Sequence, residues 1–170
     1  TIEVYTIDAP LAPEELEAAA RGPLSDPVIQ TYRIDRGLAC GFDWLIEVGF
    51  RPGVTDNVGK TAGEAIALLI GEPVRVYTSR QYAVSGVRDR CALDHLTRAD
   101  AERIASELLA NDLIQRYEII DGRTWDPAQG MKPHVPRVLG EDHPRTEEID
   151  LGGADEALIR ISQERVLVLN

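Results

Sequence analysis

Alternating apolar and polar positions divide the first 122 residues into short strands and amphipathic helices. Runs with strand alternation and many β-branched residues predict strands at 2–7, 28–34, 44–50 and 113–120. Two shorter runs predict a pair of strands at 74–78 and 81–84. Apolar residues at helical spacing predict helices that begin at Pro13, span 57–70 and span 99–110, with a loop at 87–96. This order of elements indicates an α+β fold.

The predicted helix starts carry capping residues. Thr55 or Asp56 is expected to cap the helix that spans 57–70, because a side-chain oxygen there can accept a hydrogen bond from a free helix N–H. Thr97 precedes the next helix, with Asp100 three residues later. That spacing predicts a capping box that uses the shorter acid.

A helix–strand segment occurs twice, at 16–34 and 101–119. Identical residues recur in its strand part, where Ile29, Gln30, Tyr32 and Ile34 match Ile114, Gln115, Tyr117 and Ile119. The apolar stripe of the helix recurs as well, where Leu16, Ala20 and Leu24 match Ala101, Ala105 and Leu109. We interpret the pair as an internal duplication that presents equivalent helix faces to one sheet. The alternative is that two unrelated helix–strand junctions converged in composition.

The composition is that of a soluble globular protein with an acidic surface. Hydrophobic residues make up 44% and charged residues 28%, enough for a buried core. The formal charge of −11 repels phosphate backbones and anionic lipids, so we expect no nucleic-acid or membrane partner. No apolar run reaches the roughly 20 residues of a membrane helix, and no signal peptide is visible. We therefore expect a cytoplasmic protein whose two cysteines are reduced.

The chain changes character after residue 122, which predicts three regions. Residues 1–122 form the duplicated domain, and 123–150 form a linker or wrapping loop rich in proline and glycine. A short extended piece at 147–151 is followed by a helix that begins at Asp155, and residues 151–170 form the third region. The final apolar run at 166–169 needs a partner to pack against, so we expect the chain to continue toward a catalytic domain.

The segment from Gly53 to Thr61 resembles a phosphate-binding loop between a strand and a helix. A P-loop has four residues between its first glycine and the Gly-Lys-Thr triplet, because its backbone N–H groups form a nest of fixed size. Five residues separate Gly53 from Gly59 here. The spacing favours a simple turn followed by a capped helix.

No catalytic, cofactor-binding or metal residue is nominated from the remaining polar residues. Cys40 lacks the glycine pattern of an amidotransferase nucleophile, and Cys91 with His95 supplies only two ligands for a metal. Two further histidines lie in a different, proline-rich context, at His134 and His143. Carboxylates cluster where helix starts and linkers would place them, at Glu14, Glu15, Glu17, Glu147, Glu148 and Asp150.

Three segments resemble phosphoribosylformylglycinamidine (FGAM) synthase, in the PurS-like amino-terminal domain of the large synthase. The segment from Phe50 to Lys60 resembles the family's strand–turn–helix opening, with its Arg-Pro-Gly-Val sequence. The segment 102–114 is similar to the family's second helix and its Leu-Leu-Ala-Asn-Pro-Val-Ile run, with Asp112 and Leu113 replacing Pro-Val. The segment 24–29 is closer still to that run. The segment 155–170 resembles the linker helix toward the ATP-binding part of the synthase.

The resemblance implies duplicated, PurS-like or ferredoxin-like strand–helix–strand units that form a mainly antiparallel sheet with helices on one face. It implies a non-catalytic scaffold that holds the glutaminase and synthetase parts together, with self-association as a further property. ATP and Mg²⁺ would act in the complete synthase, and no cofactor would bind to this chain. Arg51, Lys60 and Arg75 would either contact a ligand or solvate the edge of the sheet.

Two other functions remain open from the residues alone. One is a nucleotide-hydrolysing enzyme that uses Lys60 and Thr61. The other is a free-standing ligand-sensing module of ferredoxin-like fold, because one fold hosts many functions.

Overall fold

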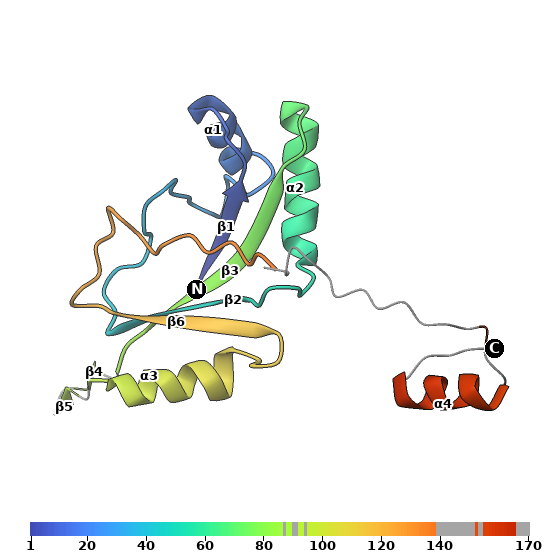
Figure 1. Cartoon of the computed structure of the whole chain (residues 1–170). Helices are drawn as coiled ribbons and strands as arrows, with labels where there is room; N and C mark the ends of the chain where they lie inside the picture. The colour runs from blue at the N-terminus through green and yellow to red at the C-terminus, as the bar shows by residue number, and fades with distance from the viewer. Residues whose placement is uncertain (87, 90–91, 94, 139–151, 153–154, 166–170) are drawn as a thin grey trace. The chain divides into compact units, whose positions relative to one another are not determined.

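The computed structural model describes residues 1–86, 88–89, 92–93, 95–138, 152 and 155–165. The chain forms two compact units, 1–138 and 139–170, which are treated separately below. The first unit contains a four-stranded sheet with three helices, and the second contains one helix, α4 (Figure 1).

The sheet is antiparallel throughout. Its spatial order is β1 (Ile2–Asp8), β3 (Arg75–Val84), β2 (Trp44–Phe50) and β6 (Gln115–Asp121). Every neighbouring pair in this order runs antiparallel. The α+β class and the antiparallel sheet are therefore confirmed, and the predicted strand 44–50 has the same bounds as β2.

β3 is one continuous strand of ten residues, so the prediction of two short strands is wrong. The polar residues in its middle interrupted the sequence pattern. Ser79 donates a hydrogen bond to Glu47 on β2 at 2.8 Å, and Arg80 lies 3.5 Å from Glu3 on β1. Partners on both neighbouring strands therefore keep this polar stretch in the sheet.

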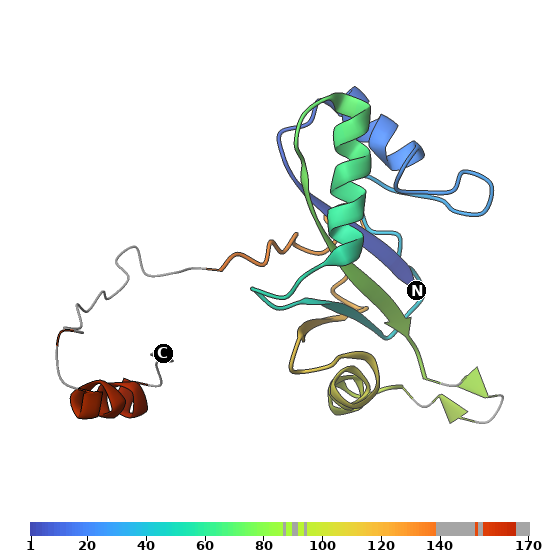
Figure 2. The same ribbon diagram turned by 90° about the vertical axis from the view of Figure 1, so that its right-hand side faces the viewer.

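Three helices cover one face of the sheet (Figure 2). They are α1 (Pro13–Arg21), α2 (Asn57–Ile70) and α3 (Arg98–Ile104), the last of which continues as a π-helical turn, η1 (Ala105–Leu109). Val76 packs beneath α1 and α2 together with Ala19 and Ile66. Ile46 packs beneath α3 together with Ala105. Because the cluster beneath α3 also includes Tyr82, six residues along β3 from Val76, both clusters lie on the same face.

The helix starts match the sequence prediction. Asp56 caps α2 by accepting a hydrogen bond from the N–H of Gly59 at 2.7 Å. The same carboxylate accepts from the backbone N–H of Thr78 at 2.6 Å, so it also ties the helix to β3. At α3, Thr97 and Asp100 form the expected capping box.

The residues after α1 form a turn and an irregular segment, so the predicted strand at 28–34 is wrong. The turn is closed by Asp26 and Gln30. The side chain of Asp26 accepts from the N–H of Val28 at 2.8 Å, and the side chain of Gln30 accepts from the N–H of Asp26 at 2.7 Å. The chain then passes the outer edge of β1, and among the described residues β1 has its strand ladder with β3 and not with this segment.

The corresponding turn after η1 is built in the same way. Asn111 accepts from the N–H of Leu113 at 3.1 Å, and Gln115 accepts from the N–H of Asn111 at 2.8 Å. In both turns the first residue's carbonyl also accepts from the two N–H groups three and four residues later. The two copies thus start their helices at equivalent residues and share the turn, but α1 ends at Arg21 whereas the second helix continues as η1 to Leu109, and the segments that follow the turns differ as well.

The other face of the sheet is covered by the chain that follows β6. Trp125 donates its indole N–H to the carbonyl of Ala39 at 2.9 Å, and its ring meets Phe42 edge-on at 5.9 Å between centroids. Arg137 reaches Asp8 at 3.2 Å. We call the segment 123–138 the wrapping segment, because it crosses this face of the sheet from β6 toward β1.

Two short strands, β4 (Arg88–Asp89) and β5 (Ala92–Leu93), pair within the region that the sequence predicts as a loop.

In the second unit, α4 spans Asp155–Arg165, so the predicted helix start at Asp155 is confirmed. The extended piece at 147–151 and the apolar run at 166–169 lie outside the described residues. Among the described helices, none has the length and apolar character needed to cross a bilayer.

We expect Asp56→Ala to lower the free energy of unfolding by about 2 kcal/mol, because α2 loses its cap and the buried N–H of Thr78 loses its acceptor. Urea titration followed by circular dichroism measures the change. Glu64→Ala on the same helix is the control, since its side chain is exposed and should change stability by less than about 0.5 kcal/mol. Equal effects of the two substitutions would contradict this role of Asp56.

Candidate functional site

Polar side chains meet on the sheet face beneath the wrapping segment. We call this set the polar cluster: Glu47 on β2, Ser79 and Gln81 on β3, Arg116 and Glu118 on β6, and His134 on the wrapping segment. Glu47 is 5% exposed and accepts hydrogen bonds from the Ser79 hydroxyl at 2.8 Å and the Gln81 amide at 2.6 Å. The buried carboxylate is therefore satisfied by uncharged donors on the neighbouring strand.

Two nitrogen atoms of the polar cluster are buried without a hydrogen-bond partner among the described residues. They are Nε of Arg116 and Nε2 of His134. Burial lowers the pKa of His134, and the nearby Arg116 guanidinium lowers it further. The carboxylates of Glu118 and Glu47 raise the pKa of His134 in part, and the net effect lowers it, which favours the neutral imidazole.

A groove of about 950 Å³ runs along the outer edge of β1. One side is formed by β1 together with α1, and the other by the irregular segment 30–38. The wrapping segment contributes residues 129–133, and the polar cluster contributes Glu47 and Gln81. We call this space the β1 groove.

The start of α2 does not form a phosphate nest. The N–H of Gly59, which a phosphate would use, is bonded to the carboxylate of Asp56. Lys60 extends into solvent and lies 4.0 Å from Glu64, and the hydroxyl of Thr61 donates to the carbonyl of Asn57 at 3.0 Å. A negative side chain thus occupies the positive end of the helix, where a nucleotide phosphate would bind.

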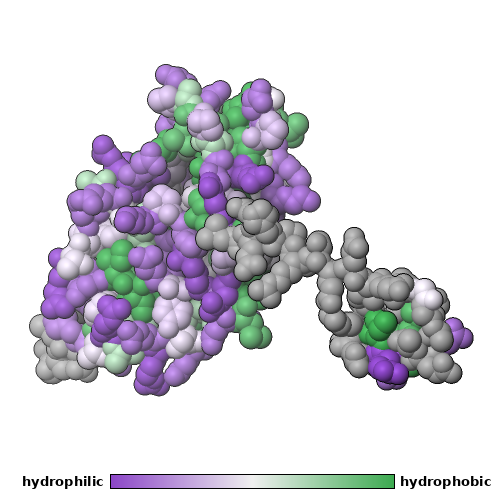
Figure 3. All heavy atoms as spheres, in the orientation of Figure 1, coloured by the Kyte–Doolittle hydropathy of each residue, from purple (hydrophilic) through white to green (hydrophobic). Residues whose placement is uncertain are grey.

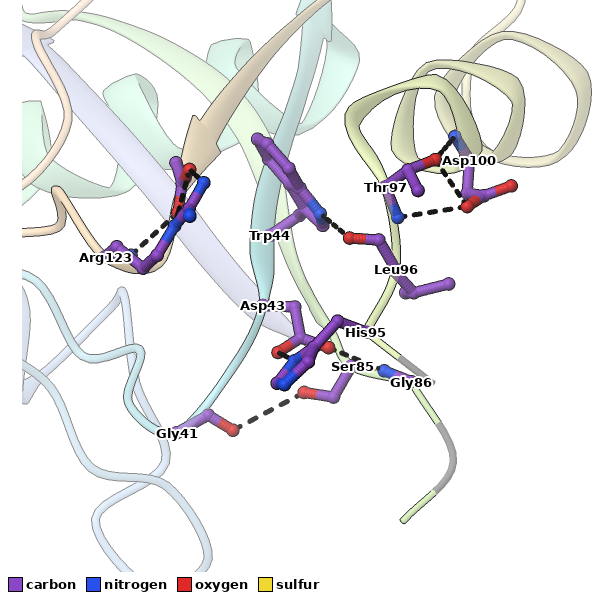
Figure 4. Close-up of polar contacts among 11 residues, drawn as sticks. Gly41, Asp43, Trp44, Ser85, Gly86, His95, Leu96, Thr97, Asp100 and Arg123 are labelled. Carbon is purple, nitrogen blue, oxygen red and sulfur yellow. Dashed lines mark hydrogen bonds and ion pairs between the residues drawn. The ribbon is translucent and has the colours of Figure 1, made fainter. Parts of the chain in front are cut away.

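Asp43, just before β2, joins the chain on either side of the β4–β5 hairpin (Figure 4). Its carboxylate accepts from the N–H of Gly86 at 2.8 Å and lies 3.5 Å from the ring of His95. The Gly86 bond is the main cause that lowers the pKa of Asp43. Beside it, the indole of Trp44 donates to the carbonyl of Leu96 at 2.7 Å. These contacts close the base of the β4–β5 hairpin.

The other residues considered from the sequence are dispersed. Cys40 is exposed, and Glu14 and Glu15 lie in the first turn of α1, where acids are favourable. Glu17 accepts a hydrogen bond from the hydroxyl of Tyr32. Outside the described residues are Cys91, His143, Glu147, Glu148 and Asp150. Within the described part of the chain, no three His, Cys, Asp or Glu residues are grouped to hold a metal ion.

The three basic residues left open by the sequence have different surroundings. The guanidinium of Arg51 donates to the carbonyl of Gln115 at 2.8 Å, so it ties the end of β2 to the turn before β6. Lys60 faces Glu64, as described above. Arg75 is exposed at the start of β3, opposite Asp8 in the ladder.

The polar cluster is the feature that sequence reasoning missed. Its members come from three strands and from a segment predicted as a linker or wrapping loop, so no local motif connects them. The one signal in the sequence was Glu47, an acid in the middle of an otherwise apolar strand pattern.

Comparison with family models, with curated proteins and with solved structures found no match for the chain.

We expect the His134 site to make the protein less stable in mild acid. Because the native pKa of His134 lies below its unfolded value near 6.5, stability is fully present above that pH and is lost as pH falls through the native pKa. His134→Asn removes this term. The difference in unfolding free energy between wild type and variant should therefore shrink from pH 8 to pH 5 in urea titrations, and a constant difference would contradict the prediction.

Proposed function

We propose that this chain is the duplicated, PurS-like amino-terminal scaffold of an FGAM synthase. In that role it holds the glutaminase and synthetase parts together in the cytoplasm. The complete enzyme uses ATP, Mg²⁺ and glutamine to convert formylglycinamide ribonucleotide into the amidine in purine biosynthesis. The chemistry would take place on the partner parts, with this chain as a non-catalytic element.

The observation that carries the proposal is the pair of matching helix–turn segments. Four hydrogen bonds recur at equivalent positions of the turns closed by Asp26 and Gln30 and by Asn111 and Gln115. These are the turns that contain the two copies of the family-like run. In each turn the glutamine side chain at the fifth position accepts a hydrogen bond from the backbone N–H of the first residue. Because this contact is not expected to recur in two unrelated helix–strand junctions, it supports a duplicated scaffold.

The segments that carry the family resemblance also contact each other. The Arg-Pro-Gly-Val turn follows β2, and its first residue, Arg51, bonds to the turn before β6 through both its backbone and its side chain. The backbone N–H of Arg51 donates to the carbonyl of Ile114 at 2.9 Å, and its guanidinium donates to Gln115. One resemblance motif thus positions the other, which supports reading both as parts of one domain.

The repeated turns leave apolar side chains in solvent. Val28 is 87% exposed and Leu113, at the equivalent position, is 88% exposed. Leu68 on α2 is equally exposed, at 90%, over the helix where hydrophobic residues gather in Figure 3, but it has no counterpart in the repeat. The apolar side chains at equivalent, projecting positions of the two turns are favourable for docking to partner domains.

The two alternative functions have different support. A nucleotide-hydrolysing role for Lys60 and Thr61 is disfavoured by the position of Asp56, described above. A free-standing ligand-sensing module of ferredoxin-like fold is compatible with the β1 groove. Binding of Mg²⁺-ATP that Lys60→Ala abolishes would favour the nucleotide-hydrolysing enzyme. Binding of an amino acid or nucleotide that the synthetase parts do not change would favour the ligand-sensing module.

Reconstitution tests the scaffold directly. The chain is mixed with the glutaminase and synthetase parts of an FGAM synthase, and amidine formation is measured with glutamine or with ammonium as nitrogen donor. A scaffold should raise glutamine-dependent formation at least about tenfold and leave ammonium-dependent formation nearly unchanged, because only the first needs the two parts assembled. Failure to co-elute with the other parts, with equal rates in the chain's presence and absence, would overturn the proposal.

A matched pair of variants localises the docking surface in the same assay. Val28→Asp combined with Leu113→Asp places charges on both repeated turns, and we expect glutamine-dependent formation to fall at least about tenfold. Leu68→Asp is the control, because it introduces the same charge at an equally exposed site on α2. An equal loss with both variants would show that the turns are not the specific contact.

A further inference from the structure

The first unit has two halves: β1, α1 and the segment 30–36 form one, and β2, β3, α3 with η1 and β6 form the other. Their strands correspond as well as their helices. Tyr5 and Ile7 on β1 pack beneath α1 and α2. Tyr82 and Val84, with the same spacing near the end of β3, pack beneath α3. Each strand leads to a helix of the repeat, and the two strands lie side by side, antiparallel. β1 therefore corresponds to β3, α1 to α3, and the segment after Gln30 to β6.

The strand β2 of the second half has no equivalent strand among the described residues of the first half. In the second half, β2 lies between β3 and β6 and pairs with both. α3 and η1 cover β2 with Ala101 and Ala105, and Leu109 packs against the same cluster. In the first half, the space between β1 and the segment 30–36 is the β1 groove.

The walls of the β1 groove repeat the surroundings of β2. Its lining includes Leu16, Ala20 and Leu24 of the first copy. These are the positions equivalent to Ala101, Ala105 and Leu109, which cover β2 in the second copy. The side opposite β1 is formed by the residues equivalent to β6. The groove therefore offers one strand edge, an apolar helix roof and a facing segment, which is the environment of a buried strand.

The outer edge of β1 is suited to pairing. In Figure 1, β1 borders the sheet, and among the described strands its ladder partner is β3 alone. Its other edge presents backbone N–H and C=O groups that an extended chain can bond. Addition of a strand to such an edge is a common mode of peptide recognition, in which the ladder gives affinity and side-chain pockets give specificity.

The charge at the rim favours an acidic segment. Arg33, Arg36 and Lys132 are exposed there, opposed by Asp35. The other two exposed charges of the lining, Glu3 and Arg80, lie 3.5 Å apart and compensate each other. A net positive rim is unusual on a chain whose formal charge is −11, and it attracts a strand that carries carboxylates.

We propose that the β1 groove binds an extended segment of a partner protein as an additional strand, antiparallel to β1. The segment has apolar side chains at alternate positions, which face Leu16, Ala20 and Leu24, and at least one acidic residue near the arginine-rich rim. The proposal goes beyond the scaffold function and does not depend on it, because it concerns any partner with this pattern.

A synthetic peptide with the sequence of residues 42–52 is the probe, because β2 fills the equivalent position in the other half. A fluorophore on the peptide reports binding to the whole chain by anisotropy. We expect saturable binding that weakens as salt rises, since Asp43 and Glu47 of the peptide meet the basic rim. Alternate residues of a strand direct their N–H groups to opposite edges, so two peptides N-methylated at odd or at even positions each lose the donors of one edge. We expect the peptide that loses the donors facing β1 not to bind, and the other to bind.

Leu16→Lys and Leu68→Lys form the matched variant pair. Leu16→Lys places a charge against the apolar roof and should weaken the peptide's affinity at least about tenfold. Leu68→Lys places the same charge on exposed α2 and should leave the affinity unchanged. Circular dichroism melts of both variants establish that the comparison concerns folded protein.

Three outcomes would overturn the proposal. The first is no saturable binding of the peptide to folded wild-type chain. The second is binding that both N-methylated peptides retain or that both lose, since a strand site must distinguish the two edges. The third is a dimer, detected by sedimentation, that Leu16→Lys dissociates and Leu68→Lys does not, which would assign the groove to a second copy of this chain.

Discussion

The first unit depends on the enclosure of β2 from both sides. Trp44, Ile46 and Val48 lie beneath α3, and Glu47 lies on the opposite face, near His134 of the wrapping segment. A strand that is buried on both faces must find a partner for every polar atom that it carries. Ser79 and Gln81 on β3 donate the hydrogen bonds that satisfy the Glu47 carboxylate. The burial of β2 therefore depends on polar partners from the neighbouring strand as well as on the apolar cluster beneath α3.

The two halves show how the same local structure serves different surroundings. Both copies of the repeat form a helix and a turn closed by glutamine. In the second copy the chain then meets the free edge of β2 and becomes β6. In the first copy it passes the β1 groove and stays irregular. A strand needs a neighbour to satisfy its backbone, so the context decides what an equal sequence pattern becomes.

Sequence patterns predict elements whose evidence is local. β2, α2 and the capping box of α3 follow from alternation, helical spacing and cap residues, and their structure agrees with the prediction. The strand predicted at 28–34 fails for a different reason. Its residues alternate between apolar and polar as those of β6 do, but β6 pairs with β2, whereas the segment 28–34 has no neighbouring strand among those described in the sheet. The polar middle of β3 and the whole polar cluster depend on contacts between distant segments. Such contacts leave no periodic signal in the chain.

Two glycines let the backbone of α2 approach the sheet closely. A Cβ atom at Gly59 would lie 2.4 Å from the carbonyl oxygen of Val76, and one at Gly63 would lie 2.6 Å from that of Val74. Helix backbone and strand backbone therefore touch directly over a full helical turn. β3 in turn pairs with both halves of the sheet. A shift of α2 relative to the sheet would therefore have to move β3, which pairs with both β1 and β2.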